Sequence, residues 1–249
     1  AAVASELNDL RAHALSIPFQ ARDPSKLKSA ISSYHKDTLG SDLWTNKELR
    51  GIPDLGLVSL SSSLDRARAL VAQPHQNLVG LSACLGKPTG GVRTIYKSPM
   101  TYRMDCRADE SIPIWEASNL QSYDTATKGS SCLVAALTRN LVAEVAHWRK
   151  HFAAGIFNDF EKFFDTMDPS VLMSQAIRQE FPPVQLTMSL QQHLAPRVIQ
   201  CAGFSGDPIE VNSSIVAGCK YSVAFTRVYN RPIVEPIHRL PAGTEIVFD

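Results

Sequence analysis

The chain has 249 residues, of which 44% are hydrophobic and 20% charged, with a formal net charge of +1 at pH 7. This composition is ordinary for a soluble globular protein and gives no support for nucleic-acid binding by itself, so local charge must carry any such argument. No apolar run reaches the roughly 18 residues that a membrane-spanning helix needs, so no membrane partner is expected.

The five cysteines are scattered, odd in number and without a CxxC pair. This pattern argues against a disulfide framework or a zinc site and favours a reducing, intracellular compartment, nuclear or cytoplasmic. The chain begins without Met and ends in an apolar run, which we interpret as a fragment cut at both ends. Its oligomeric state is left open.

Residues 1–74 are predicted to be an N-terminal helical extension. One helix follows Asp23, which is suited to an N-cap, and Pro24, which suits the first helical position. A second candidate helix lies within residues 53–72 and is ended by Pro74.

Residues 75–150 are predicted to form the next unit. Two runs rich in Leu, Val, Ile and Tyr flank the turn "PTGG", which predicts a strand, a turn and a strand over residues 77–99. Residues 101–130 look mostly irregular. The apolar spacing of residues 130–148 predicts a strong helix.

Residues 151–249 are predicted to form the third unit. "AAGIF" (153–157) and "TEIVFD" (244–249) look like strands, and residues 197–211 look like a hairpin that turns at "GFSGD". Helices are predicted at 168–181, where Asp168 is the cap, and at 184–194 and 217–237. Helices and strands alternate irregularly, so the predicted class is α+β.

Asp159 and Asp249 each end a predicted strand. Two carboxylates at neighbouring strand ends are suited to Mg²⁺, which prefers oxygen ligands and takes part in two-metal phosphoryl transfer. The alternative is that both are ordinary aspartates that cap turns.

Lys87 and Arg93 bracket the tight turn, and residues 87–107 hold five bases against the single acid Asp105. A hairpin tip with these two residues is suited to gripping a polyphosphate, although a solvated hairpin would have the same sequence. Ala217 and Gly218 precede a helix, where a ligand can approach the backbone closely or where glycine merely relieves crowding.

In chain order, several segments resemble the motifs of reverse transcriptases, most closely the non-LTR retroelement and group II intron types. "GKPTGGVRTIYKSPMTYRM" resembles the fingers hairpin, and "YDTATKGSSCLVAAL" resembles the segment after it. "NDFEKFFDTMDP" is similar to palm motif A, "SSIVAGCKYSVAF" to motif B, and "TEIVFD" to the start of motif C.

This resemblance implies a right-hand polymerase fold with fingers (75–150) and a partial palm (151–249), in which an antiparallel sheet is backed by helices and the thumb is absent. It implies RNA-directed DNA polymerase activity, with an RNA template, a DNA primer, dNTP and two Mg²⁺ ions. Asp159, Asp249 and the carbonyl oxygen of Phe160 would bind metal. Lys87 and Arg93 would hold the triphosphate, Phe164 would exclude a ribose 2′-hydroxyl, and Ala217 and Gly218 would line the nascent base pair.

Two departures leave alternatives open. Ala217 stands where the family often has Gln, and a second motif C aspartate would fall after Asp249, so this chain alone is expected to be inactive. A catalytically dead reverse transcriptase fold that binds RNA or acts as a scaffold is the main alternative. An RNA-dependent RNA polymerase is less favoured, because Phe164 and the hairpin fit a reverse transcriptase better.

Overall fold

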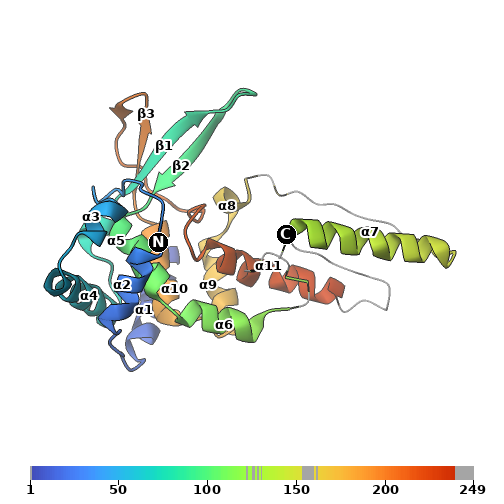
Figure 1. The fold of residues 1–249 in the computed structure, drawn as a ribbon, viewed down its shortest axis with the longest axis horizontal. Helices are drawn as coiled ribbons and strands as arrows, with labels where there is room; N and C mark the ends of the chain where they lie inside the picture. The colour runs from blue at the N-terminus through green and yellow to red at the C-terminus, as the bar shows by residue number, and fades with distance from the viewer. Residues whose placement is uncertain are drawn as a thin grey trace.

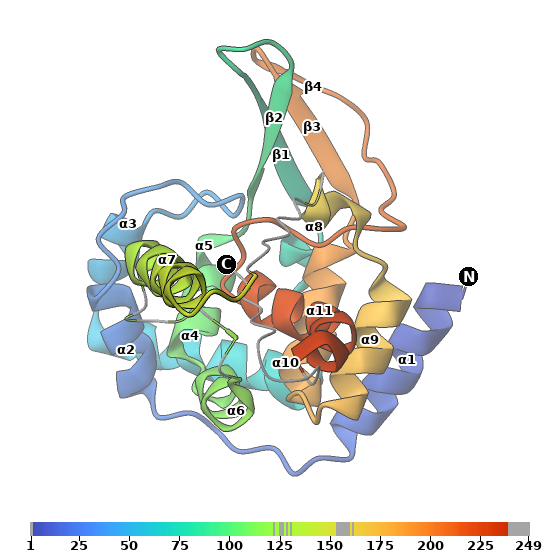
Figure 2. The ribbon, with the colours of Figure 1, turned by 90° about the vertical axis from the view of Figure 1, so that its right-hand side faces the viewer.

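The computed structural model describes residues 2–121, 123, 124, 127, 129, 131–152, 160 and 162–238, without the side chains of Arg93, Ile237 and His238. Within this part, a body of helices carries a small sheet that projects from it (Figures 1 and 2). The mixture agrees with the predicted α+β class. The helices are α1 (Ala2–Leu15), α2 (Pro24–Ser32), α3 (Asn46–Arg50), α4 (Asp54–Ala69), the 3-10 turn η1 (His75–Asn77), α5 (Met100–Ala108), α6 (Ser111–Asn119), α7 (Cys132–Trp148), α8 (Phe163–Thr166), α9 (Pro169–Arg178), α10 (Pro183–His193) and α11 (Ser222–His238).

The sheet joins two hairpins that are far apart in sequence. Its strands are β1 (Gly80–Gly86), β2 (Val92–Lys97), β3 (Arg197–Cys201) and β4 (Phe204–Ser205), in the order β2-β1-β3-β4. Both hairpins are antiparallel, as predicted, and β1 pairs in parallel with β3. The second hairpin turns at Ala202 and Gly203, earlier than predicted, because these two residues both take positive φ (49° and 86°), as a two-residue hairpin turn requires.

Two helices begin where the sequence predicts. The carboxylate of Asp23 accepts a hydrogen bond from the Ser25 N–H (2.9 Å), and that of Asp168 accepts from the Ser170 N–H (2.8 Å). A proline occupies the first turn of both α2 and α9. Each cap satisfies N–H groups that the helix itself leaves without a partner.

The prediction that residues 101–130 are mostly irregular is wrong, because α5 and α6 occupy much of this range. Helix α5 is buried on two sides: Met100 and Met104 belong to one hydrophobic cluster, and Tyr102 and Cys106 to another. A helix buried on both sides has no single apolar stripe to recognise. Its N-terminal N–H groups are capped by Asp42, a distant residue, so no local cap is visible either.

The core has two main parts. The larger cluster draws on α1, α5, α6, α9, α10 and α11, and the smaller one on α2, α3, α4 and α5. Helix α1 packs against α9 and α10, so the N-terminal helices contact the part of the chain that carries the later motifs. Helix α7 extends away from this body and buries only Ala135 among its described side chains (Figure 1).

Candidate nucleotide-binding site

Two of the predicted site segments lie side by side. The N–H of Ile215 donates to the carbonyl oxygen of Phe164 (2.9 Å), and the N–H of Ser214 donates to that of Met167 (2.9 Å). These bonds join the α8 turn (residues 162–167) to the loop before α11. We call residues 213–219 of that loop the glycine loop. The structure therefore brings Phe164 close to the segment that holds Ala217 and Gly218.

The glycine loop has a buried base and an exposed crest, which we define as Ala217 and Gly218. Ser214, Ile215, Val216 and Cys219 are buried, whereas Ala217 and Gly218 are exposed. Gly218 has a φ of +88°, and a Cβ atom added to it would meet no atom within 4 Å. Glycine is thus required there by the backbone conformation and not by crowding. An exposed crest on a buried base is suited to backbone contact with a ligand.

The aromatic rings after Asp159 form a group at the start of α8. The ring of Phe163 lies 5.2 Å from that of Phe160 and 5.7 Å from that of Phe164. Phe164 is partly buried and packs against the larger core cluster, while Phe160 is exposed. The ring of Phe164 is thus held by the core at one end of a turn whose backbone pairs with the glycine loop.

Arg197, which the sequence did not single out, links the sheet to the glycine loop. Its Nη2 donates to Ser214 Oγ (3.0 Å) and to the carbonyl oxygen of His193 (3.0 Å), and its guanidinium lies over the Tyr96 ring, 5.7 Å from the centroid. Burial lowers the pKa of Arg197, while Tyr96 and Asp165 act in the opposite direction. No motif marks a single base at the start of a strand, so only the three-dimensional contacts reveal it.

Lys87 lies in the turn between β1 and β2, at the far end of the sheet that projects from the helical body (Figure 1). The turn is closed by hydrogen bonds between Lys87 and Gly91 (3.0 Å) and between Gly90 and Lys87 (3.1 Å). The backbone of Arg93 pairs with Leu85, and its side chain is outside the described atoms. The structure does not bring Lys87 against Phe164.

The predicted metal site falls largely outside the described residues. Asp159 and Asp249 are not among them, and only Phe160 of the three predicted ligands is. Within the described part, no three His, Cys, Asp or Glu side chains are grouped so that they could hold a metal. The predicted set of two carboxylates and one carbonyl oxygen suits Mg²⁺ in the kind of its donors.

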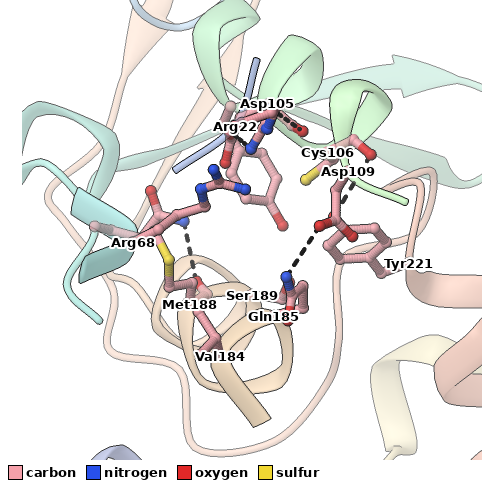
Figure 3. Close-up of a pocket in the computed structure, with 12 residues that line it drawn as sticks. Arg22, Arg68, Asp105, Cys106, Asp109, Val184, Gln185, Met188, Ser189 and Tyr221 are labelled. Atoms are coloured by element: carbon pink, nitrogen blue, oxygen red, sulfur yellow. Dashed lines mark hydrogen bonds and ion pairs between the residues drawn. The ribbon is translucent and has the colours of Figure 1, made fainter. Parts of the chain in front are cut away.

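A small polar cavity lies elsewhere, between α5, α10 and the side chains of Arg22 and Arg68 (Figure 3). The volume that the centre of a water molecule could occupy is about 10 Å³, which is close to what one water molecule needs. Arg22 Nη2 donates to Asp105 Oδ1 (2.6 Å), and Gln185 Nε2 donates to Asp109 Oδ1 (2.9 Å). This cavity is a structural polar cluster and is too small for a nucleotide.

Comparison with models of known protein families finds no match for the chain, and comparison with curated protein sequences finds no significant match. Among the helices of the described residues, none combines the length and the apolar character that crossing a bilayer demands.

Proposed function

We propose that this chain forms the fingers and part of the palm of a right-hand polymerase of the reverse transcriptase type, which adds dNTP to a primer 3′ end. The observation that carries the proposal is the pairing of the α8 turn with the glycine loop. These are the segments that resemble motifs A and B, and backbone hydrogen bonds at Phe164 and Met167 hold them together.

Each proposed role is the one that the resemblance implies, and the chemistry of the residue suits it. The Phe164 ring, held by the core on one side, occupies space that a ribose 2′-hydroxyl would need. Ala217 and Gly218 present exposed backbone to the nascent base pair. Asp159, Asp249 and the Phe160 carbonyl oxygen would hold two Mg²⁺ ions, which supply charge neutralisation at the attacking and leaving oxygens.

The projecting sheet supports nucleic acid as the partner. None of residues 80–97 or 197–206 is acidic, whereas Lys87, Arg93, Lys97 and Arg197 are basic. The parallel pairing of β1 with β3 thus places a second acid-free hairpin beside the one that carries Lys87, Arg93 and Lys97, which leaves the sheet with a positive formal charge. The resemblance assigns Lys87 and Arg93 to the incoming triphosphate, although the structure does not bring Lys87 against Phe164. We assign the sheet to phosphates of the RNA template and DNA primer, so binding is expected to weaken as salt rises.

A primer-extension assay on the full-length protein tests the proposal. Magnesium-dependent dNTP addition on an RNA template is expected. Phe164→Ala should raise ribonucleotide incorporation relative to deoxyribonucleotide incorporation, on the order of tenfold, because the ring no longer fills the 2′ position. Phe160→Ala is the matched control, since it removes a nearby ring and keeps the carbonyl oxygen.

Two outcomes would count against the proposal. An unchanged sugar preference in Phe164→Ala rejects the gate role, and the absence of extension by the unsubstituted protein rejects the polymerase.

The alternative is a catalytically dead fold of the same type that binds RNA, and Ala217 favours it because a methyl cannot replace the contacts of a glutamine near the nucleotide. RNA binding by the full-length protein without primer extension would support this alternative.

A further inference from the structure

We propose that Arg197 is a positioning residue that holds the glycine loop in a strained conformation, and that Ser214 bears this strain. The inference goes beyond the proposed polymerase. Only the effect that this loop conformation would have on nucleotide binding rests on that function. The contacts that carry it come from the sheet, from Ser214 and from the α8 turn.

The backbone of Arg197 is fixed from two sides. Its N–H donates to the Ile209 carbonyl oxygen (2.9 Å), and its own carbonyl oxygen accepts from the Ile209 N–H (2.8 Å). Arg197 is also in register with Gly80 of β1, whose N–H donates to the Pro196 carbonyl oxygen (2.8 Å). The backbone at the start of β3 is therefore well fixed, which limits where the Arg197 side chain can extend.

The guanidinium of Arg197 is held in place as well. It donates to the His193 carbonyl oxygen at the end of α10 and lies over the ring of Tyr96, whose hydroxyl accepts a hydrogen bond from Gln192 Nε2 (2.6 Å). A guanidinium stays charged even where burial lowers its pKa, so its bond to Ser214 Oγ is charge-assisted. Such a bond is stronger than one between neutral groups.

Ser214 has a φ of +90°, which residues with a side chain rarely adopt. Its hydroxyl accepts a hydrogen bond from Arg197, and its N–H donates to the Met167 carbonyl oxygen. Hydrogen bonds therefore hold Ser214 on both sides of the N–Cα bond, the bond about which φ is measured. Strain of this kind persists only where the surroundings over-determine the conformation. Glycine would adopt the same φ without strain and would not need the hydrogen bond from Arg197 to hold it there.

The hydrogen bonds to Ser214 also bear on the exposed residues Ala217 and Gly218. Ser214 lies three residues before Ala217, and the next N–H, that of Ile215, bonds to Phe164. Arg197 therefore links the start of β3 to the loop through Ser214, and the loop is linked through Ile215 to the turn that carries Phe164.

Hydrogen exchange of the glycine loop tests the inference with a pair of substitutions at one position. Ser214→Ala removes the hydroxyl and keeps the strain, so the corrected exchange rate of the Ile215 amide should rise on the order of tenfold. Ser214→Gly removes the hydroxyl and the strain together, so its rate should stay near that of the unsubstituted protein. Equal effects of the two substitutions would overturn the inference.

Arg197→Met supplies the second arm, and Arg178→Met, at an exposed position on α9, is its control. Arg197→Met should raise exchange in the loop, and adding Ser214→Ala should raise it no further, because both remove the same bond. If the two substitutions raised the exchange rate additively, they would not act through one hydrogen bond, and the inference would be contradicted. If Arg197→Met does not fold, the two Ser214 variants still decide. The readout needs no nucleotide, so failure of the proposed polymerase and failure of this inference are separate results.

Discussion

Gly80 illustrates how one residue shapes the base of the sheet. A Cβ atom at this position would lie 2.3 Å from Cε2 of Tyr96, because the tyrosine ring covers the glycine. The same ring receives the guanidinium of Arg197 and lies in the larger core cluster as a partly buried neighbour. The absence of a side chain at Gly80 therefore permits the stacking that holds Arg197.

Gly80→Ala is expected to lower the free energy of unfolding by about 1–3 kcal/mol, because the tyrosine ring and the strand must move apart. Gly86→Ala is the matched control in the same strand, since a Cβ there meets no atom within 4 Å. Urea denaturation of both variants measures the difference. Equal stability of the two would show that the Tyr96 ring can move at little cost.

At the scale of elements, the sequence was most informative where a signal is local. The caps at Asp23 and Asp168 and the turn around Gly90 and Gly91 depend on neighbouring residues, and all were predicted. Helix α5 was missed because it is buried on two sides and capped by a distant residue.

The candidate site also has parts that sequence patterns indicate and parts that only the distant contacts of the fold reveal. The resemblance singled out the segments around Phe164 and Gly218, and the structure brings these segments side by side. Their roles in binding a nucleotide stay predictions. The role of Arg197 depends on a strand pairing with Gly80 that no local pattern contains. The paired roles of Asp159 and Asp249 stay predictions, since both lie outside the described residues.

Asp168→Ala should lower the free energy of unfolding by about 0.5–2 kcal/mol, because two N–H groups at the start of α9 lose their acceptor. Ser131→Ala removes the cap of α7, a helix that buries only Ala135, so its effect on global unfolding should be smaller. Thermal and urea unfolding followed by circular dichroism compares them. A larger loss in Ser131→Ala would mean that α7 is more tightly coupled to the core than its exposure indicates.

At the scale of the whole molecule, a buried ion pair links the N-terminal segment to the centre of the fold. The side chains of Arg22 and Asp105 are 6% and 14% exposed, and Asp105 lies on α5, between the two core clusters. Burial raises the pKa of Asp105, and Arg22 counteracts part of that rise. Removing Arg22 takes away the charge that counteracts this rise most, and Arg68 is the other base that acts in the same direction.

Arg22→Met is expected to cost about 3–5 kcal/mol at neutral pH. Without Arg22 the pKa of Asp105 rises further, so the folded state keeps this proton to a higher pH than the unfolded chain does. The cost should therefore shrink as pH falls and Asp105 becomes neutral. Lys28→Met, which breaks the exposed pair with Asp54, is the control and should cost at most about 1 kcal/mol. Urea unfolding at several pH values tests this, and a cost independent of pH would contradict it.

The parallel pairing of β1 with β3 also bears on how the chain reaches its fold. The β1–β2 hairpin closes a short turn, whereas β3 reaches β1 only after the whole of residues 98–196 has been brought into a loop. Closing the longer loop costs more chain entropy, and non-local contacts of this kind slow folding. We therefore expect the pairing of β1 with β3 to form later than the β1–β2 hairpin, and with it the complete sheet that we assign to template and primer phosphates.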